Sequence, residues 1–227
     1  MHAGSKHKFD EYAASYAALH RASISASGEA PAYFAQYKVE TLVREGLEPH
    51  ARVLDYGCGI GNVLAPLART FAVVHGFDPS PESLRLAADS APNAVLHSDI
   101  ESAPEDHFDA VVLSGVLHHV APADRHRTIA RACNKLAPGG KLFVFEHNPL
   151  NPLTRRAVAA CPFDDDAILL WPWQTRAVLE HAGLSAVRLE YIVFFPRALA
   201  FLRKLEPRLA RFPLGAQVLA VGTKPRL

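Results

Sequence analysis

The chain has 227 residues, of which 49% are hydrophobic, and its 24 basic and 23 acidic side chains give a formal net charge of +1. This composition is typical of a globular domain and lacks the global positive field that a long nucleic acid partner requires. Cys58, Cys133 and Cys161 are widely separated. Their spacing argues against a disulfide framework and against a cysteine-based zinc site.

The N-terminal residues contain no apolar run of secretory-signal length, and no segment approaches the roughly 18 apolar residues of a membrane span. We therefore expect a cytoplasmic protein without an integral membrane segment. The length fits one α/β domain. We divide it into a helical cap over residues 1–48, a core over 49–147 and a looser segment over 148–227.

In chain order, residues 8–46 have a helical pattern in two pieces, with a break near Ser27, Gly28 and Pro31 and a plausible C-cap at Gly46. From residue 51, short apolar runs alternate with helical stretches. Strands are predicted over 51–57, 72–78, 93–99, 108–115 and 140–147. Helices are predicted over 62–70, 81–90 and 122–136, the last closed by a turn at 138–140. This alternation predicts a doubly wound, mostly parallel sheet with helices on both faces.

After residue 148 the pattern loosens, and it then predicts a helix over 174–184 and strands over 186–195 and 216–224, which makes seven strands. Between these two strands, residues 196–213 place leucines at helical spacing and carry five basic residues against one glutamate. We interpret this insertion as an amphipathic basic helix. Packing on the sheet, a lid over a substrate, a dimer face and contact with a membrane surface all remain open.

Gly57, Gly59 and Gly61 follow the first predicted strand and precede a helix. Glycines permit a tight turn and close approach of a ligand, and the helix N-terminus offers N–H groups to an anion. A dinucleotide fingerprint requires glycine or alanine where Asn62 stands, so an NAD-dependent oxidoreductase is the less favoured alternative. A purely structural turn would also explain the glycines.

Two acids stand at regular distances after this loop. Asp78 ends the second predicted strand, 21 residues after Gly57, and Asp99 ends the third after another 21 residues. In mononucleotide-binding sheets a carboxylate at the first of these positions accepts the ribose hydroxyls. Asp99 is placed to accept a hydrogen bond from an adenine amino group. Either acid alone would also suit a helix cap, but the three features together predict a nucleotide site.

The segments VLDYGCGIGN, GFDPS, HSDIE, FDAVVLSGVLHHV and LAPGGKLFVFEH resemble successive motifs of the class I S-adenosylmethionine-dependent methyltransferases, and the match covers about residues 50–147. The resemblance implies the Rossmann-like fold of that family. It also implies S-adenosylmethionine as cofactor, S-adenosylhomocysteine as product and a small-molecule substrate. The motifs are specific for the cofactor and say little about the substrate.

The same resemblance implies which residues contact each part of the cofactor. They are Asp55, Gly57, Cys58, Gly59 and Gly61 for the methionine part, Asp78, Pro79 and Ser80 for the ribose, Asp99 and Ile100 for the adenine, and Ser114 and Gly115 for the amine and sulfonium.

Residues ahead of the first strand often close over the cofactor in this family. Phe9, Tyr12 and Tyr16 fall on one face of a helix, so they would line a pocket for a sulfonium and a substrate or simply pack on the domain. We count Tyr16 among the candidate cofactor contacts. Lys38 is either a point charge for the cofactor carboxylate or a solvated surface lysine.

Methyl transfer is an in-line displacement that depends on alignment, and a hydroxyl acceptor also needs a base. Candidate bases follow the fourth and fifth strands: His118, His119, Glu146 and His147. We predict His147 and His119 as catalytic, although His119 is also a common structural residue at this position of the family. Irregular spacing and the lack of a carboxylate-rich surrounding predict no metal site.

Aromatic walls of a substrate pocket are expected from Trp171, Trp173, Phe163 and Phe9. The segment 148–152, NPLNP, resembles the Asn-Pro-Pro-Tyr motif of amino-methylating nucleic-acid enzymes. It lacks the second proline and the tyrosine and follows the wrong strand, so we reject that function. The sequence predicts methylation of an oxygen or nitrogen of a small molecule. A non-catalytic binding module on the same fold is the alternative, and a homodimer is left open.

Overall fold

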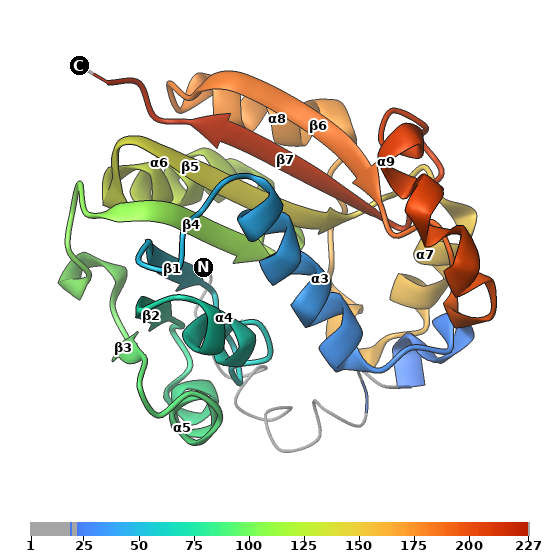
Figure 1. The fold of residues 1–227 in the computed structure, drawn as a ribbon, viewed down its shortest axis with the longest axis horizontal. Coiled ribbons are helices and arrows are strands. Elements are labelled where there is room, and N and C mark those ends of the chain that lie inside the picture. The colour runs from blue at the N-terminus through green and yellow to red at the C-terminus, as the bar shows by residue number, and fades with distance from the viewer. Residues whose placement is uncertain (1–18, 20–21, 227) are drawn as a thin grey trace.

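The alternating apolar runs form a seven-stranded sheet in the order β3-β2-β1-β4-β5-β7-β6 (Figure 1). The computed structural model describes residue 19 and residues 22–226. Strands β1 to β5 are parallel, and β7 runs antiparallel between β5 and β6. The predicted doubly wound, mostly parallel sheet is confirmed. The strands are β1 (Arg52–Tyr56), β2 (Val73–Phe77), β3 (Val95–His97), β4 (Phe108–Ser114), β5 (Leu136–His147), β6 (Ser185–Ile192) and β7 (Gln217–Thr223).

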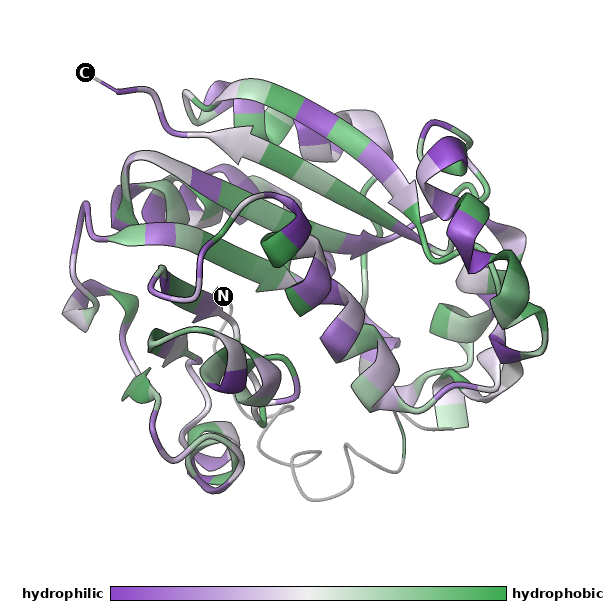
Figure 2. Ribbon diagram, in the orientation of Figure 1, coloured by the Kyte–Doolittle hydropathy of each residue, from purple (hydrophilic) through white to green (hydrophobic). Residues whose placement is uncertain are grey.

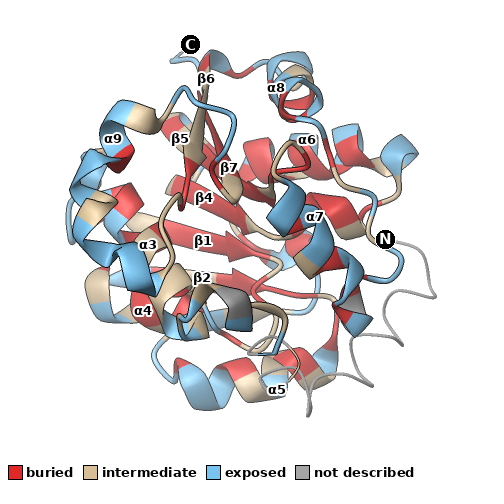
Figure 3. Ribbon diagram, turned by 90° about the vertical axis from the view of Figure 1, so that its right-hand side faces the viewer, coloured by how far each residue is buried: buried red, intermediate tan, exposed pale blue. Residues whose placement is uncertain are grey.

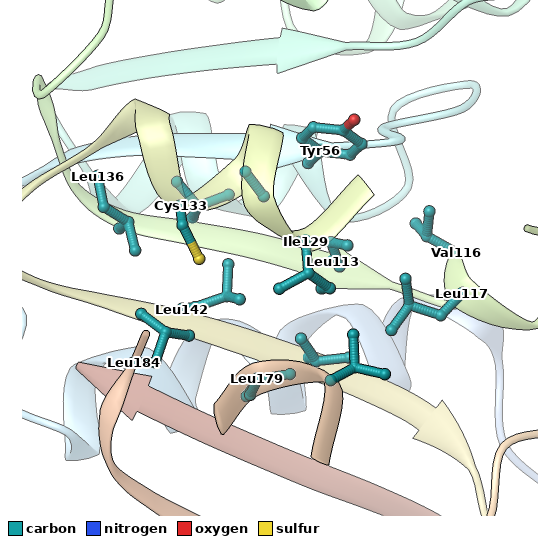
Figure 4. Close-up of a cluster of buried hydrophobic side chains, with 14 of the residues drawn as sticks. Tyr56, Leu113, Val116, Leu117, Ile129, Cys133, Leu136, Leu142, Leu179 and Leu184 are labelled. Atoms are coloured by element: carbon teal, nitrogen blue, oxygen red, sulfur yellow. The ribbon is translucent and has the colours of Figure 1, made fainter. Parts of the chain in front are cut away.

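Helices cover both faces of the sheet. On one face, α3 (Pro31–Arg44), α4 (Leu64–Thr70) and α5 (Pro81–Ser90) contribute to a core that includes Leu42 and Leu67. On the other, α6 (Arg125–Lys135) packs against β4 and β5, α8 (Pro172–His181) packs against β6 and β7, and Ile129 and Leu179 from these helices share one core (Figure 4). The central strands are mostly hydrophobic along their length (Figure 2) and buried (Figure 3). Burial on both sides explains why they appear as continuous apolar runs in the sequence.

The carboxyl ends of β1, β2, β4 and β5 lie at one edge of the sheet. The strand order runs outward from β1 to β3 on one side and from β4 onward on the other, so the topological switch point lies between β1 and β4. Ligands bind at this switch point in open α/β sheets. Strands β4 and β5 point toward the side where α7 (Pro152–Ala159) and α9 (Glu206–Leu209) lie (Figure 1). Short 3₁₀ turns connect these elements: η1 (Ser25–Ser27), η2 (Ile100–Ser102), η3 (Leu117–His119), η4 (Pro122–Asp124), η5 (Pro162–Asp164) and η6 (Arg197–Leu205).

The turn predicted at residues 138–140 is instead part of β5. Gly139 has a φ of +84° and its N–H donates to the Lys224 carbonyl at 2.9 Å, while the Lys224 N–H donates to the Gly140 carbonyl at 2.9 Å. The Pro-Gly-Gly sequence therefore forms an irregular extension of β5 that pairs just beyond the end of β7.

The single amphipathic helix predicted over 196–213 is also wrong, because the insertion divides into η6 and α9 with non-helical backbone at Leu199. Pro207 lacks an N–H and suits the start of a new helix rather than the interior of a longer one. Leu199 and Leu205 are 39% and 41% exposed, so these leucines do not pack into the core. Among the described helices, none combines the length and apolar character of a membrane span.

Candidate active site

The glycine loop after β1 is fastened to the end of β2. The N–H groups of Gly57 and Cys58 donate to the Phe77 carbonyl at 2.7 and 2.9 Å. The Asp78 carboxylate accepts from the Gly59 N–H and from the Ser80 N–H, both at 2.9 Å. Asp78 therefore fixes the loop in place, a structural task that adds to the ribose contact predicted from the sequence.

The glycines of this loop serve different purposes. A Cβ on Gly57 would come within 2.7 Å of Val116, and a Cβ on Gly61 would come within 3.2 Å of the Ala87 backbone, so both glycines allow close packing. Gly59 has a φ of +51°, and a Cβ there would meet no described residue within 4 Å. The Gly59 backbone therefore borders open space, which favours ligand approach over a purely structural turn.

Gly59→Val is expected to abolish cofactor binding and to leave the domain folded. The branched side chain would enter the open space beside the loop and would be strained at a positive φ. Circular dichroism checks the fold, and calorimetric titration with S-adenosylhomocysteine checks binding. A folded variant with normal affinity would show that the loop does not contact the ligand.

A cavity at the switch point brings together most of the predicted cofactor residues. Of the predicted set, Asp55, Gly57, Cys58, Gly59, Asp78, Pro79, Ser114 and Gly115 line it. The sequence did not single out Ile60, Asn62, Val63, Ser83 and Val116 as ligand contacts, yet they also line this cavity. Ser80 is buried and caps α5 through its hydroxyl, which accepts from the Ser83 N–H.

Asp55 is the most unusual group in this cavity. It is only 1% exposed, and neither carboxylate oxygen has a hydrogen-bond partner among the described residues. Burial and the charge of Asp78 raise the pKa of Asp55 to about 7, against the opposing effect of Lys38. A buried carboxylate without donors is costly, so this position is suited to a cationic or donor-rich ligand.

Lys38 is buried, and the alternative of a solvated surface lysine is therefore wrong. Its Nζ lies 5.7 Å from the centroid of the Phe145 ring. Burial lowers the pKa of Lys38 to about 8, although Asp55 and Glu146 favour its charged form. The lysine thus places positive charge at the sheet edge.

Asp99 and Ile100 do not line the cavity. The Asp99 side chain is 68% exposed and caps η2 by accepting from the Glu101 N–H at 3.2 Å. Ile100 is fully buried in the hydrophobic core. Their adenine contacts stay predictions from the family resemblance. Phe9, Tyr12, Tyr16 and the Phe163 side chain lie outside what the structure describes.

Asp78→Ala is expected to weaken binding of S-adenosylhomocysteine more than Asp99→Ala does. Loss of a charge-assisted hydrogen bond costs about 1.5–3 kcal/mol, or roughly ten- to a hundredfold in affinity. The exposed Asp99 should cost no more than about threefold, since contacts to an exposed carboxylate are worth little. Calorimetry on both variants decides the order, and a larger loss at Asp99 would reverse it.

A second cavity adjoins the first and shares Ser114, Gly115 and His119 with it. Its other lining groups include Lys38, Phe34 and Phe145 and a set of titratable side chains: His118, Glu146, His147 and Asp164. The predicted base candidates are therefore brought together on one wall. The predicted aromatic walls are not found there. Trp171 and Trp173 stack with their ring centroids 5.0 Å apart, and neither lines either cavity.

Glu146 organises the turn after β4. Its Oε1 accepts from the N–H groups of Val116 and Leu117 at 3.2 and 2.8 Å, and its Oε2 accepts from His118 Nδ1 at 2.6 Å. Burial alone would lower the pKa of His118, but the charges of Glu146 and Asp164 raise it to about 9. His118 is therefore held in its protonated form near neutral pH.

His147 and His119 differ in their environments. His147 is half-buried beside His118, with ring centroids 5.0 Å apart, and burial and the charge of His118 lower the pKa of His147 to about 4. His119 borders both cavities, and its Nε2 lies 3.3 Å from Asp164 Oδ1. Asp164 was not predicted, since it comes from an irregular segment whose only signal is a run of three aspartates.

Together, the glycine loop, Asp55 and Asp78 at the switch point define a class I S-adenosylmethionine-dependent methyltransferase. Residues 29–197 match the family model described as a methyltransferase domain, and the chain belongs to this family. Asp55 is buried without a hydrogen-bond partner among the residues described, which fits the amine of S-adenosylmethionine, and the space beside Gly59 fits the close approach of this cofactor.

Relatives and solved structures agree with this assignment. The chain is 30% identical over 164 residues to a ubiquinone biosynthesis O-methyltransferase of Methylobacterium nodulans, covering 63% of this chain and 64% of that one. A structure from Thermotoga maritima, titled a SAM-dependent methyltransferase and possible histamine N-methyltransferase, has a TM-score of 0.67 at 19% identity and covers 97% and 99% of the two chains. Magnesium protoporphyrin IX methyltransferase of Synechocystis with bound S-adenosylhomocysteine has a TM-score of 0.58 at 18% identity, over 85% and 82%. The chain thus spans less than two thirds of the Methylobacterium relative.

Proposed function

We propose that this enzyme methylates an oxygen of a small hydroxylated molecule bound in the second cavity. The observation that carries the proposal is the His119 side chain, which forms part of the wall of both cavities. A hydroxyl placed there would meet the cofactor pocket on one side and a cluster of imidazoles and carboxylates on the other. The similarity to the Methylobacterium relative, which is named an O-methyltransferase, supports this choice over a nitrogen acceptor.

Bound S-adenosylmethionine supplies an electrophilic methyl group on a sulfonium. The residues of this chain bind and align it. The ionised Asp55 carboxylate would accept hydrogen bonds from the cofactor amine, Asp78 would hold the ribose, and Lys38 adds positive charge for the cofactor carboxylate. Alignment of this kind contributes several kcal/mol to a displacement reaction.

A hydroxyl acceptor must also lose its proton. His118 is held protonated by its two carboxylate neighbours and is therefore not free to accept one. His147, with a pKa of about 4, is unprotonated but a weak base. We therefore assign His119 as the general base that accepts this proton. The sequence alone had placed His147 ahead of His119 for that role. General bases contribute about a hundred- to ten-thousandfold in rate.

Release of S-adenosylhomocysteine with matched pairs of small aromatic compounds tests the proposal. Each pair carries a hydroxyl in one member and an amino group at the same position in the other. The proposal requires turnover with the hydroxyl members. Turnover with the amines alone would instead support a nitrogen acceptor. Binding of S-adenosylmethionine with no turnover on any acceptor would support the non-catalytic alternative.

A further inference from the structure

Three side chains converge on the wall of the second cavity in an arrangement that the methyl transfer itself does not require. Asp164 Oδ1 lies 3.3 Å from His119 Nε2 and 3.6 Å from His118 Nε2. One nitrogen or oxygen atom from each of the three residues lies within 4.8 Å of the others. Asp164 Oδ1 is buried and makes no hydrogen bond of normal geometry with any described residue.

These separations fit a common metal ion. In a tetrahedral zinc site with bonds of about 2.0–2.1 Å, neighbouring ligand atoms lie about 3.4 Å apart. Hydrogen bonds between an imidazole and a carboxylate are shorter, at about 2.7–2.9 Å. The two distances to Asp164 Oδ1 are therefore closer to the spacing of shared metal ligands than to that of a direct hydrogen bond.

Each histidine also has a carboxylate behind its other ring nitrogen. Glu146 Oε2 lies 2.6 Å from His118 Nδ1, and Asp166 Oδ1 lies 3.8 Å from His119 Nδ1. Metal-binding histidines commonly donate this second N–H to a carboxylate, which fixes the tautomer and turns the free nitrogen toward the metal. Here the Glu146 hydrogen bond fixes His118 with its Nε2 toward Asp164, and Asp166 stands near the corresponding nitrogen of His119.

The backbone holds the three residues together without help from a ligand. The Ile168 N–H donates to the His118 carbonyl at 2.9 Å, and the buried Arg125 donates to the Ile168 carbonyl at 2.5 Å. Arg125 also donates to the carbonyls of Leu117 and Val120 at 3.1 Å. The segment that carries Asp164 is thus tied to η3, which carries both histidines.

We propose that His118, His119 and Asp164 bind a divalent transition metal ion of the zinc class, with an open coordination position toward the second cavity. Two imidazoles and one carboxylate are the ligand set of open zinc sites, whereas magnesium and calcium prefer oxygen ligands throughout. The irregular histidine spacing and the lack of nearby carboxylates in the sequence predicted no metal site, and Asp164 is 45 residues beyond His119. If the proposed function holds, a bound metal would displace the proton from His118 Nε2 and occupy His119 Nε2, so the metal would take the place of His119 as base by binding the acceptor hydroxyl and lowering its pKa.

Metal titration of the full chain tests the site independently of any methyl acceptor. Protein freed of metal by a chelator is titrated with Zn²⁺ in competition with a chromophoric chelator, and with Co²⁺ for its visible absorption. We expect one tight ion per chain. Loss of one ligand in His119→Ala or in the nearly isosteric Asp164→Asn should weaken that binding at least about tenfold.

His97→Asn is the matched control. His97 Nε2 lies 2.9 Å from His75 Nδ1, so this pair is a close imidazole pair outside both cavities that could also attract metal. The control should bind Zn²⁺ as the wild type does. Retained affinity for S-adenosylhomocysteine shows that each variant is folded. The proposal is overturned if the wild type binds no metal tightly, or if His119→Ala and Asp164→Asn bind it as well as the wild type does.

Discussion

Asp55→Asn is expected to weaken cofactor binding by about a hundredfold or more. The substitution keeps the shape of the side chain and removes the charge that would meet the cofactor amine. Removing one partner of a buried, hydrogen-bonded charge pair typically costs about 2–5 kcal/mol. Calorimetric titration with S-adenosylhomocysteine measures the loss. Asp89→Asn is the control, because the Asp89 side chain is 77% exposed on α5 and should leave the affinity unchanged.

The pH dependence gives the same prediction a second readout. With a pKa of about 7, Asp55 is protonated below neutral pH and must lose that proton to bind a cation. Wild-type affinity should therefore fall as the pH drops below 7, approaching about tenfold per pH unit. Asp55→Asn should not show this dependence. An affinity that is flat between pH 5 and pH 8 in the wild type would contradict the role given to Asp55.

The folding stability of the wild type should change with pH in the direction opposite to its cofactor affinity. Because the folded state raises the pKa of Asp55 from 3.8 to about 7, the stability that its protonated form contributes is complete below the ordinary pKa and is lost as the pH rises to 7. The melting temperature of Asp55→Asn, taken relative to that of the wild type at the same pH, should therefore be higher at pH 8 than at pH 5.

His119→Ala is expected to lower kcat by about a hundred- to ten-thousandfold, the usual range for loss of a general base. Loss of a metal ligand at the same residue would act in the same direction. Affinity for S-adenosylhomocysteine should stay within about threefold, and added imidazole should restore part of the rate. His147→Ala should lower kcat less, because burial and the neighbouring His118 leave His147 a weak base.

His126→Ala on α6 is the control for a histidine outside both cavities, and it should keep full activity. If His147→Ala is the more damaging of the two active-site variants, the base lies after β5 rather than after β4. If both variants keep near-full rate, the enzyme works by alignment alone and a nitrogen acceptor becomes the better proposal.

The sequence was sufficient for the parts of the site that sit on regular elements. Gly59 and Asp78 follow predicted strand ends at fixed distances, so spacing placed both on one sheet edge, and the family resemblance added Asp55 near the end of the first strand. The family resemblance added Ser114 and Gly115 at the end of β4, and the structure places them in the same cavity.

The missing parts come from irregular backbone. Asp164 lies in η5, where no period predicts position, and hydrogen bonds from Ile168 and Arg125 hold that segment near the histidines. Likewise, Pro207 begins a new helix inside the insertion. The burial of Lys38 depends on how α3 packs across the sheet edge, which helical periodicity alone does not specify.

The claim that the methyl acceptor binds in the second cavity is tested most directly by filling that cavity with a large side chain. Ala157 on α7 lines this cavity, whereas Ala159 on the same helix is exposed. Turnover is followed by mass spectrometry as transfer of a trideuteromethyl group from labelled S-adenosylmethionine. We expect Ala157→Trp to reduce transfer at least about a hundredfold with unchanged affinity for S-adenosylhomocysteine, and Ala159→Trp to transfer at the wild-type rate. Full transfer by Ala157→Trp would show that the acceptor binds elsewhere.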